Sequence, residues 1–188
     1  MDIETAKATL GEDFTLLFEV MQTQLQELEL DRDARILDVG TGMGRVAISL
    51  ALSGYQVLTG EPADDHSEYA KQPWFADARK VGVEGAITFQ PFDAEKLPFD
   101  SGAFDAVFML GALHHISDPA LAVSECIRVM SPAGVFCVLE PSVALVELVR
   151  ARFPTHPDPV DPRPFVQDLP VQLNRGEKFD IYVIRASE

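Results

Sequence analysis

Three glycines at alternating positions follow a short apolar run, and they form the segment of this chain with the clearest chemical meaning. Residues 36–45 read ILDVGTGMGR, with Gly40, Gly42 and Gly44 in the turn. Glycine has no Cβ, so its backbone turns tightly and lies close to a ligand. In an open α/β sheet, such a loop between a strand and a helix predicts a ligand site at the carboxyl end of the strand.

The spacing of these glycines indicates the kind of ligand. A dinucleotide fingerprint, GxGxxG, would place its last glycine where Arg45 stands. Asp38 precedes the first glycine by two positions, and a carboxylate there is unfavourable beside a pyrophosphate but well suited to an ammonium group. The loop therefore favours a cationic nucleoside over a dinucleotide. A glycine-rich turn without a ligand is the structural alternative.

A second acidic residue supports the nucleoside interpretation. Residues 57–61 read VLTGE and end in Glu61. An acid at the end of the second strand, about 20 residues after the glycine loop, accepts hydrogen bonds from ribose hydroxyls. Alone, Glu61 would be interpreted as a solvated surface residue. Together with the loop, it predicts a ribose contact.

The elements that must position these residues alternate along the chain. Short apolar runs predict strands, and helical periodicity falls between them near 44–53, 66–80, 118–130 and 142–152. The first five strands are expected at 35–39, 55–59, 86–90, 104–109 and 134–139. Alternation of this kind predicts βαβ units and a parallel sheet with helices on both faces.

The two ends of the chain depart from this alternation. Residues 1–33 read as helical, and we expect them to form an N-terminal helical lid on a binding domain that spans 34–188. A proline-rich loop at 154–164 precedes strands at 165–173 and 178–185, whose turn at 174–177 suits an antiparallel hairpin. The predicted fold is α/β, a Rossmann-like seven-stranded mostly parallel sheet with a C-terminal antiparallel β-hairpin.

A third segment, 92–99, reads FDAEKLPF. With it, residues 34–140 resemble the class I S-adenosylmethionine-dependent methyltransferases, particularly the small-molecule group that carries a D-A-x-x-L-P-F segment. The resemblance implies that the chain binds S-adenosyl-L-methionine and transfers its methyl group. It does not identify the acceptor.

The resemblance also implies roles for individual residues. Asp38 would hold the methionine end of the cofactor, which the three loop glycines would line, and Glu61 would hold the ribose. Asp93 would accept the adenine amino group, and the Ala94 backbone N–H would bond a ring nitrogen. The remaining expected contacts are Pro62, which would pack on the adenine although proline is not the commonest residue there, and Leu110 and Gly111, whose backbone would lie near the methionine.

Two adjacent histidines, His114 and His115, are the candidates for a general base. Consecutive residues point in different directions, so we do not expect both rings to act on one atom. One ring could line the pocket while the other packs, or caps the helix that begins near Asp118. We expect no metal site, because no third histidine and carboxylate cluster accompanies the pair in the sequence.

Charge and composition restrict the partners. The formal net charge of −15 disfavours nucleic acid and anionic lipid surfaces, which leaves a small-molecule acceptor. No apolar run reaches the roughly 18 residues of a membrane helix. Cys126 and Cys137 are the only two cysteines, which suits a reduced, cytoplasmic protein. The oligomeric state is not indicated.

Two other function classes remain open. A catalytically silent S-adenosylmethionine-binding module or partner subunit would keep the same pocket. An NAD-dependent oxidoreductase would use a similar sheet, although Asp38, Arg45 and the pair Asp93-Ala94 argue against it.

Overall fold

The computed structural model describes residues 2–64 and 73–186. Within them the sheet has seven strands in the order β3-β2-β1-β4-β5-β7-β6. The strands are β1 (Ile36–Val39), β2 (Val57–Gly60), β3 (Ile87–Phe89), β4 (Phe104–Leu110), β5 (Met130–Pro141), β6 (Val171–Arg175) and β7 (Phe179–Arg185). The chain forms two compact units, Met1–Phe92 and Asp93–Glu188.

Strand direction confirms the predicted fold class. In the first unit β1 pairs with β2 and β2 with β3, both in parallel. In the second unit β4 pairs with β5 in parallel, whereas β7 runs antiparallel to both β5 and β6. The sheet is therefore mostly parallel and ends in an antiparallel hairpin, as in a Rossmann-like fold.

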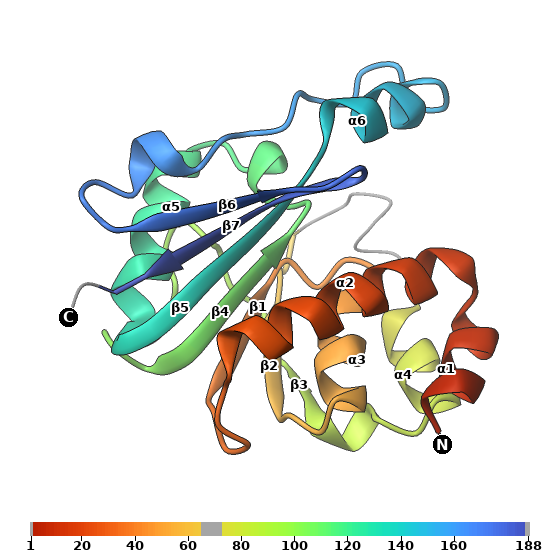
Figure 1. The fold of residues 1–188 in the computed structure, drawn as a ribbon. Coiled ribbons are helices and arrows are strands. Elements are labelled where there is room, and N and C mark those ends of the chain that lie inside the picture. The colour runs from red at the N-terminus through yellow and green to blue at the C-terminus, as the bar shows by residue number, and fades with distance from the viewer. Residues whose placement is uncertain (1, 65–72, 187–188) are drawn as a thin grey trace. The chain divides into compact units, whose positions relative to one another are not determined.

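Helices α1 and α2 precede β1, and the later helices lie between strands along the chain (Figure 1). Those of the described residues are α1 (Ile3–Leu10), α2 (Glu12–Leu28), α3 (Arg45–Leu52), α4 (Trp74–Lys80), α5 (Pro119–Val129) and α6 (Val143–Arg150), with short 3-10 turns η1 (Glu84–Ala86), η2 (Leu113–His115) and η3 (Arg163–Phe165). The helix expected over 66–80 lies partly outside the described residues, and its described part is α4. No helix among the described residues is both long and apolar enough to cross a membrane.

The N-terminal segment is two helices rather than one continuous helix. Gly11 separates them at φ +88°, a left-handed conformation that glycine adopts easily. The apolar stripe of α2 is buried, with Phe14 and Phe18 at most 3% exposed and their ring centroids 5.9 Å apart. Helix α2 lies along α3 (Figure 1), and Gln22 Nε2 donates to Ser53 Oγ at the end of α3. Packing onto α3 thus accounts for the amphipathic pattern of α2.

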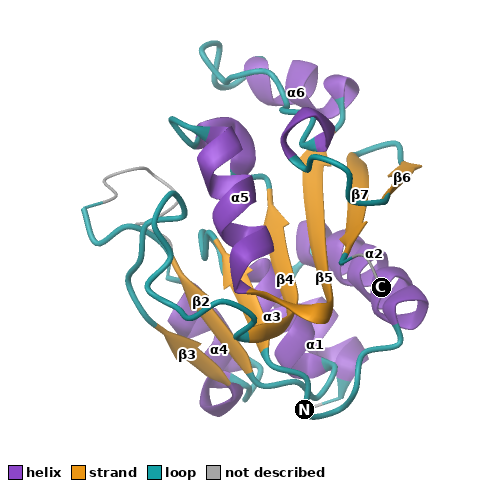
Figure 2. Cartoon of the chain, turned by 90° about the vertical axis from the view of Figure 1, so that its left-hand side faces the viewer, coloured by secondary structure: helices purple, strands orange, loops and turns teal. Residues whose placement is uncertain are grey.

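The second unit is built on the buried strands β4 and β5, with α5 beside them (Figure 2). Asp118 caps α5 by accepting from the Leu121 N–H, and Pro119 occupies the first turn, where its missing N–H costs nothing. Strand β5 begins earlier than expected, at Met130, and the β4–β5 register shifts between Phe104 and Ala106.

The C-terminal hairpin is shorter than the sequence predicts. Residues 165–170 are not a strand, because η3 and a following turn occupy them, and β6 begins only at Val171. The turn itself is confirmed: Gly176 N–H donates to the Phe179 carbonyl across it.

Candidate active site

The glycine loop joins β1 to α3 in a conformation that side chains rarely adopt. Gly40, Gly42 and Gly44 have φ values of +90°, +47° and +67°. A Cβ at Gly44 would lie 2.8 Å from the Cβ of Trp74, whereas a Cβ at Gly42 would meet no atom of the described residues within 4 Å. The loop is thus packed at its helix end and open above Gly42.

The strand that precedes this loop carries a buried carboxylate, Asp38. Asp38 is fully buried in β1, its Oδ2 accepts from the Thr59 hydroxyl at 2.8 Å, and its Oδ1 has no hydrogen-bond partner among the described residues. The Thr41 hydroxyl lies 2.9 Å from that of Thr59. Burial raises the pKa of Asp38 to about 7, the nearby Glu61 carboxylate raises it as well, and the Thr59 bond lowers it. No ion pair to this carboxylate is formed within residues 2–64 and 73–186, and an ammonium group would supply a cation there.

Glu61 lies directly on the glycine loop. Its Oε2 accepts from the Gly42 N–H at 2.9 Å, and it follows Gly60, whose carbonyl accepts from the Gly40 N–H. The structure therefore brings together the two acidic residues and the glycines that the sequence singles out in the first unit. Pro62, the next residue, is exposed.

In the second unit, the segment that begins at Asp93 forms a tight turn. Asp93 is exposed, its Oδ1 accepts from the Glu95 N–H at 2.8 Å, and its carbonyl accepts from the Lys96 N–H. Ala94 is 9% exposed. This geometry holds the Asp93 side chain at the turn.

Two charged residues of α5 hold the rest of that segment. Glu125 Oε2 accepts from the Leu97 N–H, and Arg128 donates to the Leu97 and Phe99 carbonyls. The Arg128 guanidinium also lowers the pKa of Glu125. The segment is therefore fixed by a network that satisfies its backbone.

Strand β4 leads into both candidate histidines. Leu110 ends the strand half-buried, and Gly111 follows at φ +57° with its N–H donating to the Leu139 carbonyl. The two rings were expected to diverge, and this was wrong: the 3-10 turn η2 places the ring centroids of His114 and His115 4.2 Å apart. His114 is buried and His115 exposed, and α5 is capped by Asp118 rather than by either ring.

The sequence did not predict that two further residues, Glu140 and His156, contact these histidines. Glu140, at the carboxyl end of β5, is 1% exposed, and its Oε2 lies 2.7 Å from His114 Nδ1. His156, in the proline-rich loop, lies with its ring centroid 5.0 Å from that of His114. No local pattern indicates either contact, because each depends on how β5 and the loop after α6 return to η2.

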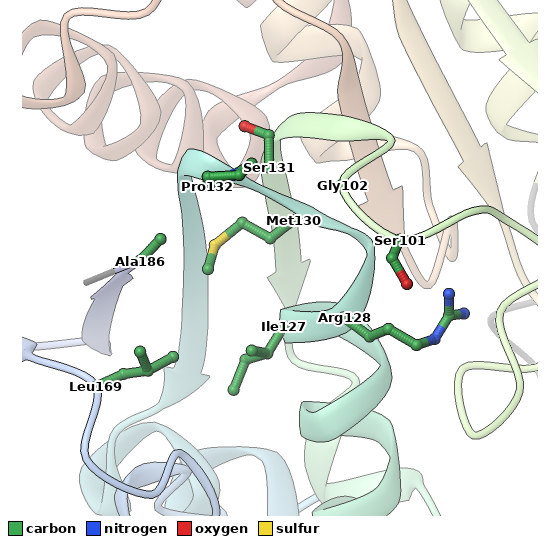
Figure 3. A pocket seen from close by; sticks show the side chains of 9 residues that line it. All are labelled: Ser101, Gly102, Ile127, Arg128, Met130, Ser131, Pro132, Leu169 and Ala186. Atoms are coloured by element: carbon green, nitrogen blue, oxygen red, sulfur yellow. The ribbon is translucent and has the colours of Figure 1, made fainter. Parts of the chain in front are cut away.

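One hollow of the second unit lies elsewhere (Figure 3). Its volume is about 620 Å³, and its lining includes Gly102, Met130 and Ala186. Gly102 and Met130 mark the amino ends of β4 and β5, whereas the histidines follow the carboxyl end of β4 and Glu140 lies near the carboxyl end of β5. Ligands of α/β sheets gather at carboxyl ends, so this hollow is not the candidate active site.

A family model described as "Methyltransferase domain" matches residues 37–138, more than half of the chain. The matched range runs from the glycine-loop strand β1 into β5. The chain therefore belongs to the methyltransferase domain family, whose usual methyl donor is S-adenosylmethionine.

Individual relatives agree with this assignment. A demethylmenaquinone methyltransferase of Clavibacter sepedonicus is 30% identical over 128 residues, which cover 68% of this chain and 49% of the relative. A ubiquinone biosynthesis O-methyltransferase of Alkalilimnicola ehrlichii is 40% identical over 101 residues, which cover 53% of this chain and 38% of the relative. The chain thus spans about half or less of the length of these curated relatives.

The fold also matches solved structures. The YcgJ protein of Bacillus subtilis superimposes with a TM-score of 0.69 at 19% identity, covering 89% of this chain and 98% of that one. At this identity the likeness shows the fold alone, and it confirms the Rossmann-like sheet.

Proposed function

We propose that this chain binds S-adenosyl-L-methionine and transfers its methyl group to a small-molecule acceptor in the cytoplasm. In the first unit, Asp38 would hold the methionine ammonium, Gly40, Gly42 and Gly44 would line the ligand, and Glu61 would accept from the ribose hydroxyls. The assignment to the small-molecule group rests on the D-A-x-x-L-P-F segment at 93–99. Two relatives are named for menaquinone and ubiquinone, and these names support a small-molecule acceptor.

The observation that carries the proposal is the buried carboxylate beside an open glycine loop. Asp38 Oδ1 has no partner among the described residues, and the space above Gly42 is open. A buried, unpartnered carboxylate oxygen is costly unless a cation or donor satisfies it. The residues present therefore fit a ligand with an ammonium group and a ribose.

In the second unit, the proposed contacts belong to the adenine and to the methionine chain. Asp93 would accept the adenine amino group, and the Ala94 N–H would bond a ring nitrogen. Pro62 of the first unit would pack on the adenine. Leu110 and Gly111, where β4 ends, would line the methionine through their backbone.

Methyl transfer from a sulfonium requires no covalent intermediate with the protein. When bound, the cofactor would supply an electrophilic methyl group, whose transfer leaves a neutral thioether. The protein must align the acceptor with that group and exclude water. Where the acceptor is a hydroxyl or a protonated amine, a base must remove its proton. We propose His114 or His115 for that role, with Glu140 accepting from His114 Nδ1 and so leaving Nε2 to take the proton.

Gly42→Arg is expected to abolish binding of S-adenosylhomocysteine while the fold is retained, because the long side chain would enter the open space above the loop. Isothermal titration measures the binding, and circular dichroism checks the fold. Gly82→Arg is the matched control, because Gly82 also has a positive φ, +73°, and open space at its Cβ. It carries the same backbone strain and should bind normally.

The wild-type titration separates the other functions. Tight NAD binding without a response to S-adenosylhomocysteine would indicate an oxidoreductase. Binding of S-adenosylhomocysteine without methyl transfer to any acceptor in a broad screen would indicate a silent binding module. If Gly42→Arg and Gly82→Arg lose binding equally, the prediction that the glycine loop lines the ligand is wrong.

Asp93→Ala is expected to weaken S-adenosylhomocysteine binding about tenfold, since one hydrogen bond to a buried base is worth roughly 1–1.5 kcal/mol. Asp93 is exposed, so the thermal midpoint should change little. Exposed Asp100→Ala is the control for loss of a nearby charge. Unchanged affinity in Asp93→Ala would disprove the adenine assignment.

A further inference from the structure

Three histidines of the second unit gather around one point. His114 and His115 belong to η2, and His156 comes from the loop after α6. One ring nitrogen from each lies within 4.8 Å of the other two. His114 is buried, His156 half-buried and His115 exposed, so the cluster reaches the surface.

Hydrogen bonds fix the proton positions of two of these rings. His156 Nδ1 lies 3.0 Å from the Pro157 carbonyl, which can only accept, so Nδ1 carries the proton. His114 Nδ1 lies 2.7 Å from Glu140 Oε2. An ionised carboxylate can also only accept, so beside it His114 Nδ1 carries the proton. Both rings then keep a lone pair on Nε2. Metal-binding histidines show this arrangement, in which the second ring nitrogen donates to a carboxylate or a backbone carbonyl.

Glu140 itself requires a nearby positive charge. It is 1% exposed; its Oε2 also accepts from the Val160 N–H, and its Oε1 has no hydrogen-bond partner among the described residues. A buried carboxylate in this state is costly unless a cation compensates it. Arg150, in α6, is already bonded to the His156 carbonyl and to Asp158.

The geometry of the three rings suits a single ion. Their centroids are separated by 4.2, 5.0 and 5.3 Å, and one ring nitrogen of each lies within 4.8 Å of the others. A metal ion ligated by neutral imidazoles would place one compact positive charge at this point, close to the buried Glu140 carboxylate.

We propose that His114, His115 and His156 bind one divalent transition-metal ion, with Zn²⁺ as the reference ion and Glu140 as the residue that orients His114. Imidazole is a preferred ligand of zinc, copper and nickel. Tetrahedral zinc with Zn–N bonds near 2.05 Å would place its nitrogens roughly 3.3 Å apart, so small side-chain rotations would close the present cluster on an ion. The sequence predicts no metal site, because the third histidine is distant along the chain.

Three protein ligands leave a fourth position open on a tetrahedral ion, as in catalytic rather than structural zinc sites. That position would bind an oxygen of the acceptor and lower its pKa, so that its proton would be lost to water. This role rests on the proposed methyl transfer, whereas metal binding does not. A histidine that ligates a metal no longer accepts a proton, so zinc would inhibit a histidine-base mechanism and stimulate a metal-assisted one.

Titration of the purified chain with ZnCl₂, followed by calorimetry, tests the site directly. We expect one ion per chain, and His156→Ala should weaken binding about tenfold or more. Co²⁺ in place of zinc should give the strong visible absorption of a tetrahedral complex. His66→Ala controls for the number of histidines, because His66 is the only other histidine of the chain. Glu140→Gln should keep the cobalt spectrum but lower the affinity.

The variants keep the test decisive. His114 is buried, so its loss could disturb folding, but the exposed His115→Ala and the half-buried His156→Ala are checked by circular dichroism. Absence of zinc binding by the wild type, or binding that His115→Ala and His156→Ala leave intact, would overturn the proposal. Since none of these measurements uses S-adenosylmethionine, their failure would leave the methyltransferase proposal standing.

Discussion

Asp38→Asn should make the unbound protein more stable at pH 8 while weakening its binding of S-adenosylhomocysteine tenfold or more. The carboxylate is fully buried and one of its oxygens has no partner among the described residues. The amide that replaces it carries no charge to desolvate, and its oxygen can still accept from Thr59. The same change removes the anion that we propose faces the ligand ammonium. Urea unfolding and calorimetric titration measure the two effects.

The pH dependence gives the sharper test. The folded state raises the pKa of Asp38 from its usual 3.8 to about 7. Between about pH 4 and pH 7 the folded protein therefore binds more protons at this group than the unfolded chain does. The free energy of unfolding should fall as the pH rises through that window, by up to about 4 kcal/mol, and then level off. Asp38→Asn should lose this fall.

Ligand binding should show the opposite trend. An ammonium beside Asp38 favours the ionised carboxylate, so wild-type affinity for S-adenosylhomocysteine should rise between pH 6 and pH 8, and the affinity of Asp38→Asn should not. Exposed Asp33→Asn removes the same formal charge at the surface and serves as the control. Identical pH profiles in the wild type and Asp38→Asn would contradict the burial argument.

Local sequence signals predicted the parts of the fold that local interactions decide. Alternating apolar runs located the strands, and the turn at 174–177 located the hairpin. The predicted elements were wrong at two places where a local turn interrupts the expected helix or strand. Gly11 at φ +88° ends a helix inside a continuous amphipathic pattern, and the short turn η3 with its following residues replaces the start of the expected strand at 165.

The residues of the candidate site are also of two kinds, those that local sequence predicts and those that it does not. Asp38, the loop glycines and Glu61 are predictable, because all lie at or beside strand ends within the single unit β1-α3-β2. The partners of His114 are not. Glu140 lies 26 residues and His156 lies 42 residues further along the chain, and only the paths of β5 and of the loop after α6 bring them to η2. Neither residue has a spacing that marks it in the sequence.

Gly60→Ala should be strongly destabilising, because the Cβ approach at Gly60 is the closest among the first-unit glycines compared within the described residues. A Cβ at Gly60 would lie 2.0 Å from the Gln90 carbonyl oxygen and 2.5 Å from the Phe92 ring. The Gln90 backbone cannot move aside freely, because its N–H donates to the Thr59 carbonyl. Overpacking costs about 1–3 kcal/mol and occasionally more. We expect at least the upper end of that range, measured by urea unfolding.

The same variant should also disturb the site. The Gly60 carbonyl accepts from the Gly40 N–H of the glycine loop, and Glu61 follows Gly60 directly, so a displaced β2 end would move the carboxylate that we propose to bind the ribose away from Gly42. Weakened S-adenosylhomocysteine binding should therefore accompany the loss of stability. Gly85→Ala is the control, because a Cβ there meets nothing within 4 Å. If the two variants unfold at the same urea concentration, close packing at the end of β2 is not what requires glycine at position 60.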